Sequence, residues 1–201
     1  ENPLTARVIV NRVWQHHFGR GLVRSSNDFG QFGTRPTHPQ LLDWLANELV
    51  SHQWRLKSLH KTIMMSSTYQ MSAQSNQHAL LADPHNNLFW RFNMRRLSAE
   101  EIRDSVLLVT GNLNQKLGGP SVFPDLPAEV LATSSQPKRV WGKSSPEEAN
   151  RRSIYVKVKR SLLVPILNQF DMANTDSTCA VRFVTTVPTQ SLTMLNGKFI
   201  N

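Results

Sequence analysis

The apolar residues of this chain recur at steps of three and four, in short segments separated by glycine and proline. This spacing places apolar side chains on one face of an α-helix. It is clear after Pro3, again after Pro39, over residues 57–67 and after Ser98. The longest uninterrupted apolar runs contain only a few residues, so no segment predicts a membrane span. The pattern predicts a mainly α fold.

Two helix starts are marked by residues that satisfy free backbone N–H groups. Asn2 precedes Pro3, which is a typical entry because Asn accepts from the first turn and Pro tolerates the first helical position. Ser98 is followed by Glu101 at the spacing of a capping box. These signals predict where the helices begin.

One segment has the alternation of a β-strand. Over residues 152–160, Ile154, Val156 and Val158 alternate with Tyr155 and with lysines. A lone strand is not stable, so it needs a partner, for which 138–141 and 182–187 are the candidates. The fold class expected is therefore mainly α, an irregular helical domain with one small antiparallel β hairpin or two-stranded sheet.

The length of 201 residues suits a single domain with its own core. We expect one domain over 1–201, with a helical body at 1–117, an irregular, β-containing part at 118–187 and a terminal helix at 188–199. Leu192, Leu195 and Phe199 form the predicted apolar stripe of that helix. Both ends are abrupt, and we expect a C-terminally truncated fragment of a larger multidomain protein.

Cysteine and histidine usage limits the chemistry of the chain. The only cysteine is Cys179, so no internal disulfide, no cysteine-based zinc or iron–sulfur site and no c-type haem attachment is expected within this chain. All seven histidines fall in the first 85 residues, but none has the spacing of a metal site. We therefore expect no metal and no cofactor in this chain.

Four residues of the first part are candidates for catalysis, namely His16, His17, Asp28 and His38. An enzyme would bring at least two of them together in one pocket. The alternative is structural: His17 lies on an apolar stripe, as a hydrogen-bonded core histidine does, and Asp28 in a glycine-containing loop is typical of a turn. The residues leave open whether the protein is an enzyme.

The positive charge is concentrated in one region. Residues 138–160 hold eight lysines and arginines against two glutamates, which accounts for +6 of the formal +9. This surface is either an ordinary solvated face or a site for an anionic polymer. Nucleic-acid binding is a further alternative, although few aromatic residues are interleaved with the basic ones. The anion-binding candidates are Lys138, Arg139, Arg151, Arg152, Lys157, Lys159 and Arg160.

Several long motifs together resemble a known family. They are residues 2–7 (NPLTAR), 11–21 (NRVWQHHFGRG), 27–30 (NDFG), 37–45 (THPQLLDWL), 151–155 (RRSIY) and 185–190 (TTVPTQ). The chain resembles the planctomycete-type domain of unknown function that is found C-terminal in large exported proteins with cytochrome c-like domains. Ser191 stands where the family usually has alanine, and the family's domain usually continues beyond residue 201.

The resemblance implies an extracytoplasmic (periplasmic or secreted) parent protein, with haem only in another domain. The partners it implies are other domains of the parent, including a cytochrome c-like domain, and an anionic (sulphated) polysaccharide. It implies no established activity, so it assigns no catalytic residue. A binding or scaffold module is the favoured hypothesis. An oxidoreductase or polysaccharide-acting enzyme using the His/Asp motifs is the alternative, and nucleic-acid binding is disfavoured by export.

Overall fold

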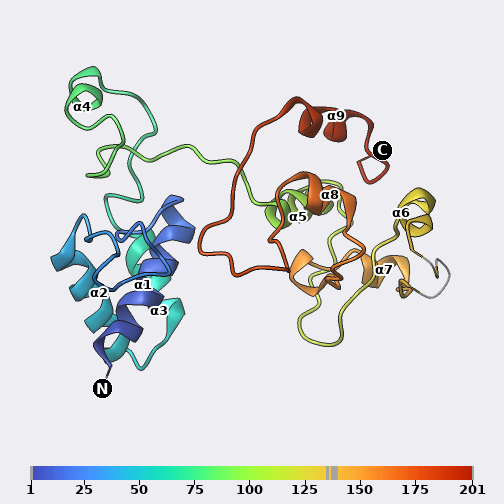
Figure 1. Ribbon diagram of the computed structural model, residues 1–201, viewed down its shortest axis with the longest axis horizontal. Coiled ribbons are helices and arrows are strands. Elements are labelled where there is room, and N and C mark those ends of the chain that lie inside the picture. The colour runs from blue at the N-terminus through green and yellow to red at the C-terminus, as the bar shows by residue number, and fades with distance from the viewer. Residues whose placement is uncertain (1, 135, 137–139, 201) are drawn as a thin grey trace. The chain divides into compact units, whose positions relative to one another are not determined.

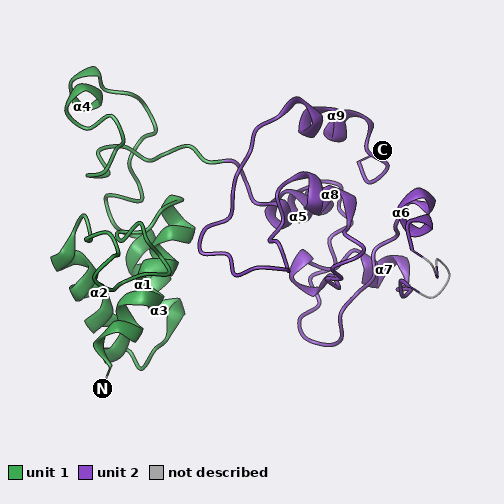
Figure 2. Ribbon diagram, in the orientation of Figure 1, with its two compact units in different colours: residues 1–95 green, residues 96–201 purple. Residues whose placement is uncertain are grey.

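The computed structural model describes residues 2–134, 136 and 140–200. Within them the chain is mainly helical, as its apolar spacing predicted (Figure 1). It divides into two compact units, residues 1–95 and residues 96–201 (Figure 2). The boundary lies inside the predicted helical body 1–117. That the units act as one domain stays a prediction.

Unit 1 is built on three helices that pack together, α1 (Pro3–Phe18), α2 (Pro39–Ser51) and α3 (Leu56–Met64). A short fourth helix, α4 (Gln77–Ala82), stands apart from them on a long loop (Figure 1). Each large apolar side chain buried in the core contributes about 1.5–3 kcal/mol. The core includes Val10, Val13, Trp14, Phe18, Leu22, Leu42, Leu45, Leu49, Leu59, Ile63 and Phe89.

Helix α1 begins where its sequence predicted and ends at a glycine. The Asn2 side chain accepts a hydrogen bond of 3.0 Å from the backbone N–H of Leu4. At the other end Gly19 is left-handed, with φ of 80°, and its N–H donates to the Gln15 carbonyl. A residue with a side chain is strained in that conformation, so glycine terminates the helix here.

One buried amide fixes the loop that follows α1. Asn11 is fully buried; its Oδ1 accepts from the Val23 N–H at 2.8 Å, and its Nδ2 donates to the Val23 carbonyl at 2.9 Å. A Cβ at Gly21 would lie 2.6 Å from both terminal atoms of this amide. The loop therefore closes on α1 only because residue 21 has no side chain.

Unit 2 contains short helices joined by long irregular segments. They are α5 (Ala99–Val109), α6 (Ala128–Ala132), α7 (Pro146–Ala149), the 3-10 turn η1 (Ser153–Tyr155), α8 (Pro165–Gln169) and α9 (Pro188–Asn196). Helix α5 packs against α8 and η1, and α8 packs against α9. The capping box of α5 is present as predicted: the side chains of Ser98 and Glu101 each accept a hydrogen bond from the other residue's backbone N–H. The core includes Ala99, Val122, Val156, Val164, Ile166, Leu167 and Phe170.

The predicted hairpin is not confirmed. Residues 153–155 form η1, and Val156 makes only an isolated parallel bridge with Val122, which lies in neither predicted partner segment. The alternation predicted one buried face, but Ile154 and Val158 are 76% and 49% exposed. The backbone is bonded locally instead, because the N–H of Tyr155 donates to the Arg152 carbonyl. Such turns leave fewer backbone N–H and carbonyl groups free for hydrogen bonds between β-strands.

The apolar stripe predicted for the last helix is also absent. Leu192 and Leu195 are exposed, whereas Gln190 is buried. The Gln190 amide donates to the Gln169 carbonyl at 3.1 Å and to Thr185 Oγ1 at 3.0 Å. Helix α9 is therefore held to α8 by a buried polar side chain as well as by packing.

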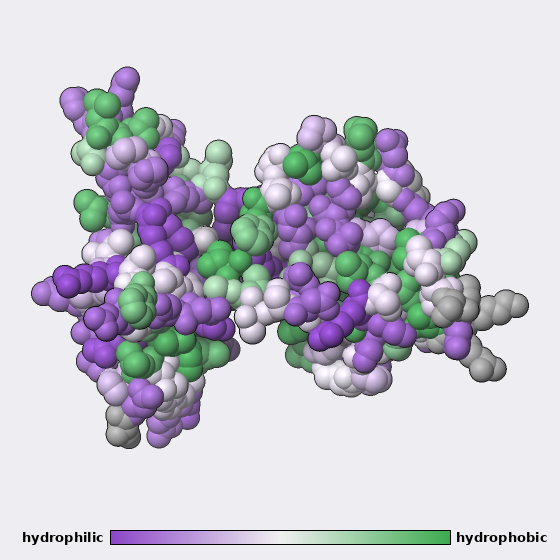
Figure 3. All heavy atoms as spheres, viewed as in Figure 1, coloured by the Kyte–Doolittle hydropathy of each residue, from purple (hydrophilic) through white to green (hydrophobic). Residues whose placement is uncertain are grey.

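Apolar side chains also reach the surface of both units, as the hydropathy colouring of Figure 3 shows. None of the helices in the described residues is both long enough and apolar enough to span a bilayer. The isolated exposure of apolar residues is common in folded proteins.

Candidate functional site

The candidate catalytic residue His17 is paired with another histidine. His17 Nε2 and His60 Nδ1 lie 2.7 Å apart, and the His17 ring stands edge-on to Tyr69. Burial lowers the pKa of His17, and the nearby His60, His16 and Arg95 lower it further. One shared proton satisfies such a pair only while at least one ring is neutral. The arrangement is that of a hydrogen-bonded packing pair.

The other three candidates lie in separate surroundings. His16 is exposed near the end of α1, and Asp28 Oδ1 accepts from the Gly30 N–H at 2.8 Å in a turn. His38 precedes α2, with its Nδ1 3.0 Å from Thr37 Oγ1. Within the described residues, no hydrogen bond joins any two of the four candidates, and none of them lines the two pockets described below. Their catalytic role stays a prediction.

A search for metal sites finds none in the part of the chain that the structure describes. No three His, Cys, Asp or Glu side chains are grouped there as ligands of one ion. Cys179 is a free, exposed thiol.

The predicted anion-binding residues are divided between the surface and the interior. Arg152 and Lys157 are exposed, and the Arg152 guanidinium lies 3.8 Å from the Asp104 carboxylate. Arg160 lies 3.2 Å from Asp176, with both side chains largely exposed. Such exposed pairs are weak and are screened by salt.

The remaining basic candidates give less exposed charge than the sequence pattern indicated. Lys159 is half-buried, and its ammonium donates to the Val140 carbonyl at 2.6 Å. Lys138 and Arg139 lie outside the described residues. Of the predicted anion-binding residues that the structure describes, Arg152, Lys157 and Arg160 are the exposed cations.

Arg151 is inside the protein, where an anionic polymer does not reach it. Its guanidinium donates to the backbone carbonyls of Lys116, Gly118 and Pro120, and lies 3.9 Å from the Tyr155 ring centre. Its side chain is 0% exposed. This inward position corrects the expectation of a surface cation, because the donors of Arg151 are used to hold the 116–120 loop.

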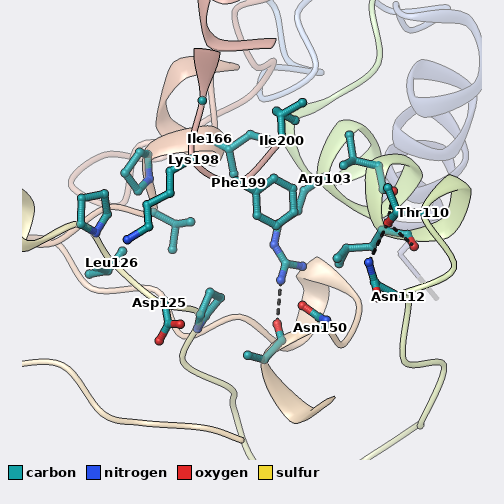
Figure 4. A pocket seen from close by; sticks show the side chains of 18 of the residues that line it. Arg103, Thr110, Asn112, Asp125, Leu126, Asn150, Ile166, Lys198, Phe199 and Ile200 are labelled. Carbon is teal, nitrogen blue, oxygen red and sulfur yellow. Dashed lines mark hydrogen bonds between the residues drawn. The ribbon is translucent and has the colours of Figure 1, made fainter. Parts of the chain in front are cut away.

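Sequence reasoning missed a pocket of about 500 Å³ in unit 2 (Figure 4). Its walls come from α5, α7, α8, the proline-rich stretch 124–127 and residues 193–200 after and within α9. A volume of this size suits a small molecule or one or two sugar rings. Its polar and charged lining residues are Arg103, Thr110, Asn112, Asp125, Asn150, Thr193 and Lys198.

Arg103 of α5 is the buried cation of this pocket. Only 1% of it is exposed, and its guanidinium donates to the carbonyls of Ala149 at 2.7 Å and Arg151 at 3.0 Å, and to Ser153 Oγ at 3.2 Å. Its Nε is buried without a hydrogen-bond partner. Among the described residues, these bonds use three of the five N–H donors of the guanidinium, so two are left in a side chain that lines a cavity.

The electrostatics of Arg103 favour an incoming anion. Burial lowers the pKa of Arg103, and the Asp104 carboxylate, 3.7 Å away, opposes that effect. A buried charge is costly unless it is paired. Backbone carbonyls and the Asp104 carboxylate, which is not hydrogen-bonded to Arg103, compensate this charge only in part. A negative group in the pocket offsets part of that cost.

The rest of the pocket adds a second cation and an apolar wall. Figure 4 shows Lys198 and Arg103 on opposite sides of the open space. The Phe199 ring lies next to the guanidinium, with its centre 5.5 Å from the guanidinium carbon. Asp125 is also in the lining, so one negative charge stands against two positive ones. Ile166 and Leu126 contribute apolar surface.

Arg103 differs from the other buried arginine in its access to space. Among the described residues, Arg151 also has a buried Nε without a partner, but it lines neither the pocket of unit 2 nor that of unit 1. The sequence held one signal for Arg103: it is four residues from both Ala99 and Leu107, and all three are buried on one face of α5. The stripe predicted for this helix ran through Ile102 instead.

The helices and the pocket define a mainly helical domain with a ligand-sized, cationic cavity. The PSD1 family, described as a protein of unknown function (DUF1553), matches residues 1–201 of the chain. The chain therefore belongs to this family. Comparison with curated proteins and with solved structures finds no match.

Proposed function

We propose that this chain is a binding module, and that the pocket of unit 2 binds an acidic group of its ligand. The observation that carries the proposal is the buried Arg103, whose Nε has no partner and whose side chain lines a pocket of about 500 Å³. Sulfate and carboxylate groups are the matching partners, because they accept charge-assisted hydrogen bonds from guanidinium donors.

The lining supports an acidic sugar as the ligand. Lys198 offers a second cation across the space from Arg103, while Phe199 and Ile166 offer apolar surface for the C–H face of a ring. A pocket of this kind uses apolar walls for affinity and a few polar groups for orientation. We propose a sulphated polysaccharide as the source of the acidic group, with the sulfate between Arg103 and Lys198.

The proposal extends to the parent protein through the family resemblance. The module belongs to an exported protein, acts outside the cytoplasm and works beside a cytochrome c-like domain, which holds the haem. The exposed Arg152, Lys157 and Arg160 then add weak, salt-sensitive attraction for the polyanion. Enzyme activity is not part of the proposal, since the four His and Asp candidates form no shared site.

The test measures the affinity of the 201-residue chain for a sulphated galactan oligosaccharide and for its desulphated counterpart. Lys198→Ala removes the exposed pocket cation without disturbing the core, and we expect it to weaken binding of the sulphated sugar about tenfold. Arg103→Lys keeps a charge but removes Nε, and we expect a similar or larger loss. Lys157→Ala is the matched control, because it removes an exposed lysine outside the pocket, and we expect less than a twofold change.

Two results would overturn this proposal. Equal affinity for the sulphated and desulphated sugars would show that no acidic group is recognised. A loss with Lys157→Ala but not with Lys198→Ala would move the site to the basic segment and away from the pocket.

A further inference from the structure

Unit 1 has a pocket of its own, whose lining differs in kind from that of unit 2. It has a volume of about 530 Å³ and lies between the start of α1 and the outer face of α2. It is lined by Asn2, Pro3, Thr5, Ala6, Arg7, Asp43, Ala46, Asn47, Val50 and Trp54. We call it the Trp54 groove.

The indole of the groove is partly exposed on a strained backbone. Trp54 is 44% exposed and follows the end of α2, where its N–H donates to the Leu49 carbonyl at 2.8 Å. Both Gln53 and Trp54 are left-handed, with φ of 55° and 61°. Glycine is the residue that adopts this conformation without cost, and a bulky residue there is uncommon. Strain of this kind gathers at functional sites.

Polar side chains stand beside the indole at helical spacing. Asp43 and Asn47 are four residues apart on α2, so they lie on the same face of the helix, and both line the groove. Together they offer carboxylate and amide oxygens as acceptors and one amide donor group. Within the described residues, the structure gives the Asn47 amide no hydrogen bond. These groups suit a ligand rich in hydroxyls.

The charge of the groove is balanced. Arg7 Nε donates to Asp43 Oδ1 at 2.6 Å, and this ion pair neutralises both groups while it fixes the carboxylate. A second carboxylate oxygen, Oδ2, is left for another partner. The groove therefore offers hydrogen bonds and an aromatic surface without the net positive charge of the unit 2 pocket.

We propose that the Trp54 groove is a binding site for a neutral sugar ring. The indole contacts the C–H face of a pyranose, and Asp43 and Asn47 bond its hydroxyls. Pockets for small ligands combine an aromatic surface with a few placed polar groups in this way. The proposal is independent of the acidic-group site, because a neutral sugar carries no sulfate or carboxylate.

The experiment titrates the 201-residue chain with neutral hexasaccharides of glucan, galactan, mannan and xylan, and follows binding by isothermal titration calorimetry. We expect at least one of them to bind and Trp54→Ala to weaken that binding tenfold or more. Asn47→Ala is expected to weaken it about threefold. Trp44→Ala is the matched control, since Trp44 is a 50% exposed tryptophan on α2 that lines neither of the two pockets.

Lys198→Ala serves as a second control, because it removes a cation of the other pocket and is expected to leave neutral-sugar binding unchanged. Circular dichroism of each variant confirms that it is folded. The proposal is overturned if none of the hexasaccharides binds at 10 mM or below, or if Trp54→Ala and Trp44→Ala have the same effect. A loss caused by Trp54→Ala but not by Trp44→Ala supports it.

Discussion

In each unit a buried polar side chain holds irregular backbone in place, but the two units use different side chains. In unit 1 the neutral amide of Asn11 closes the loop after α1 with two hydrogen bonds. In unit 2 the guanidinium of Arg151 holds the 116–120 loop, and Arg103 holds the backbone at 149–153. An amide carries no charge, whereas each buried guanidinium brings a positive charge inside, near Glu148 for Arg151 and near Asp104 for Arg103.

This difference explains why the pockets are unlike each other. The Trp54 groove contains a paired Arg7 and Asp43, and its lining is balanced. The unit 2 pocket has Arg103 at its wall and Lys198 across from it, with Asp125 as the only acidic residue of its lining. The charge that fixes the fold of unit 2 thus also determines what its pocket attracts.

Arg151→Met is expected to have the largest effect on stability. It removes the buried guanidinium whose donors hold three carbonyls of the 116–120 loop, which lowers the free energy of unfolding by about 3 kcal/mol. Urea unfolding measures the total, and hydrogen exchange is expected to show the loss at 116–120. Arg152→Ala is the control, since an exposed arginine costs less than about 0.5 kcal/mol. Equal effects of the two substitutions would contradict the structural role of Arg151.

Asn11→Ala is expected to have a smaller effect, of about 2 kcal/mol. It leaves the N–H and the carbonyl of Val23 buried without partners, but it removes no charge. Hydrogen exchange in 19–37 is the measurement, with Asn27→Ala, an exposed asparagine, as the control. Unchanged protection of the Val23 amide in the Asn11 variant would show that the loop is held by other contacts.

Acidification is expected to have the smallest effect on stability, and to affect unit 1 but not unit 2. The folded state lowers the pKa of His17, so the unfolded chain binds a proton more readily, and stability falls as the pH decreases through the ordinary histidine pKa. All seven histidines are in unit 1. Between pH 7.5 and 5.5 we expect hydrogen-exchange protection to fall around His17 and His60 and to stay constant in 96–200. His17→Gln should flatten the change, and an equal change in both units would refute this account.

In unit 2 the titration of the Asp171 carboxylate changes stability at a lower pH. Burial alone would raise the pKa of Asp171, but hydrogen bonds from Thr185 and the charge of Arg96 together lower it. Stability from this carboxylate is therefore present above its ordinary pKa and is lost only as the pH falls through the lowered value. That window lies below the range in which histidines titrate.

The sequence was sufficient for elements whose signals are local. Asn2 and Ser98 marked helix starts because capping depends on neighbouring residues alone. The strand prediction at 152–160 was wrong because alternation says nothing about whether the backbone bonds are already used in turns. Gln190 was missed because an apolar stripe is the usual sign of a buried face, and here an amide is buried.

The candidate site was less accessible to sequence reasoning. Arg103 and Lys198 are 95 positions apart in the chain, and they line the same pocket only because α5, α8 and α9 pack together. A charged residue is ordinarily assigned to the surface, so the pattern indicated neither Arg103 nor Arg151 as buried. Trp54 carries no turn signal, because its left-handed backbone occurs without glycine. The histidines were candidates because seven of them fall in the first 85 residues, but closeness in sequence does not bring their side chains together in space.

The most direct test of the acidic-group pocket observes the Arg103 Nε–H by NMR as a sulphated galactan oligosaccharide is added. The NMR signal of this N–H is expected to shift when the N–H donates a hydrogen bond to the sulfate, while the Nε–H signal of Arg151 stays in place and the desulphated sugar leaves both unchanged. If the sulphated sugar binds without moving the Arg103 signal, the account of this pocket is wrong.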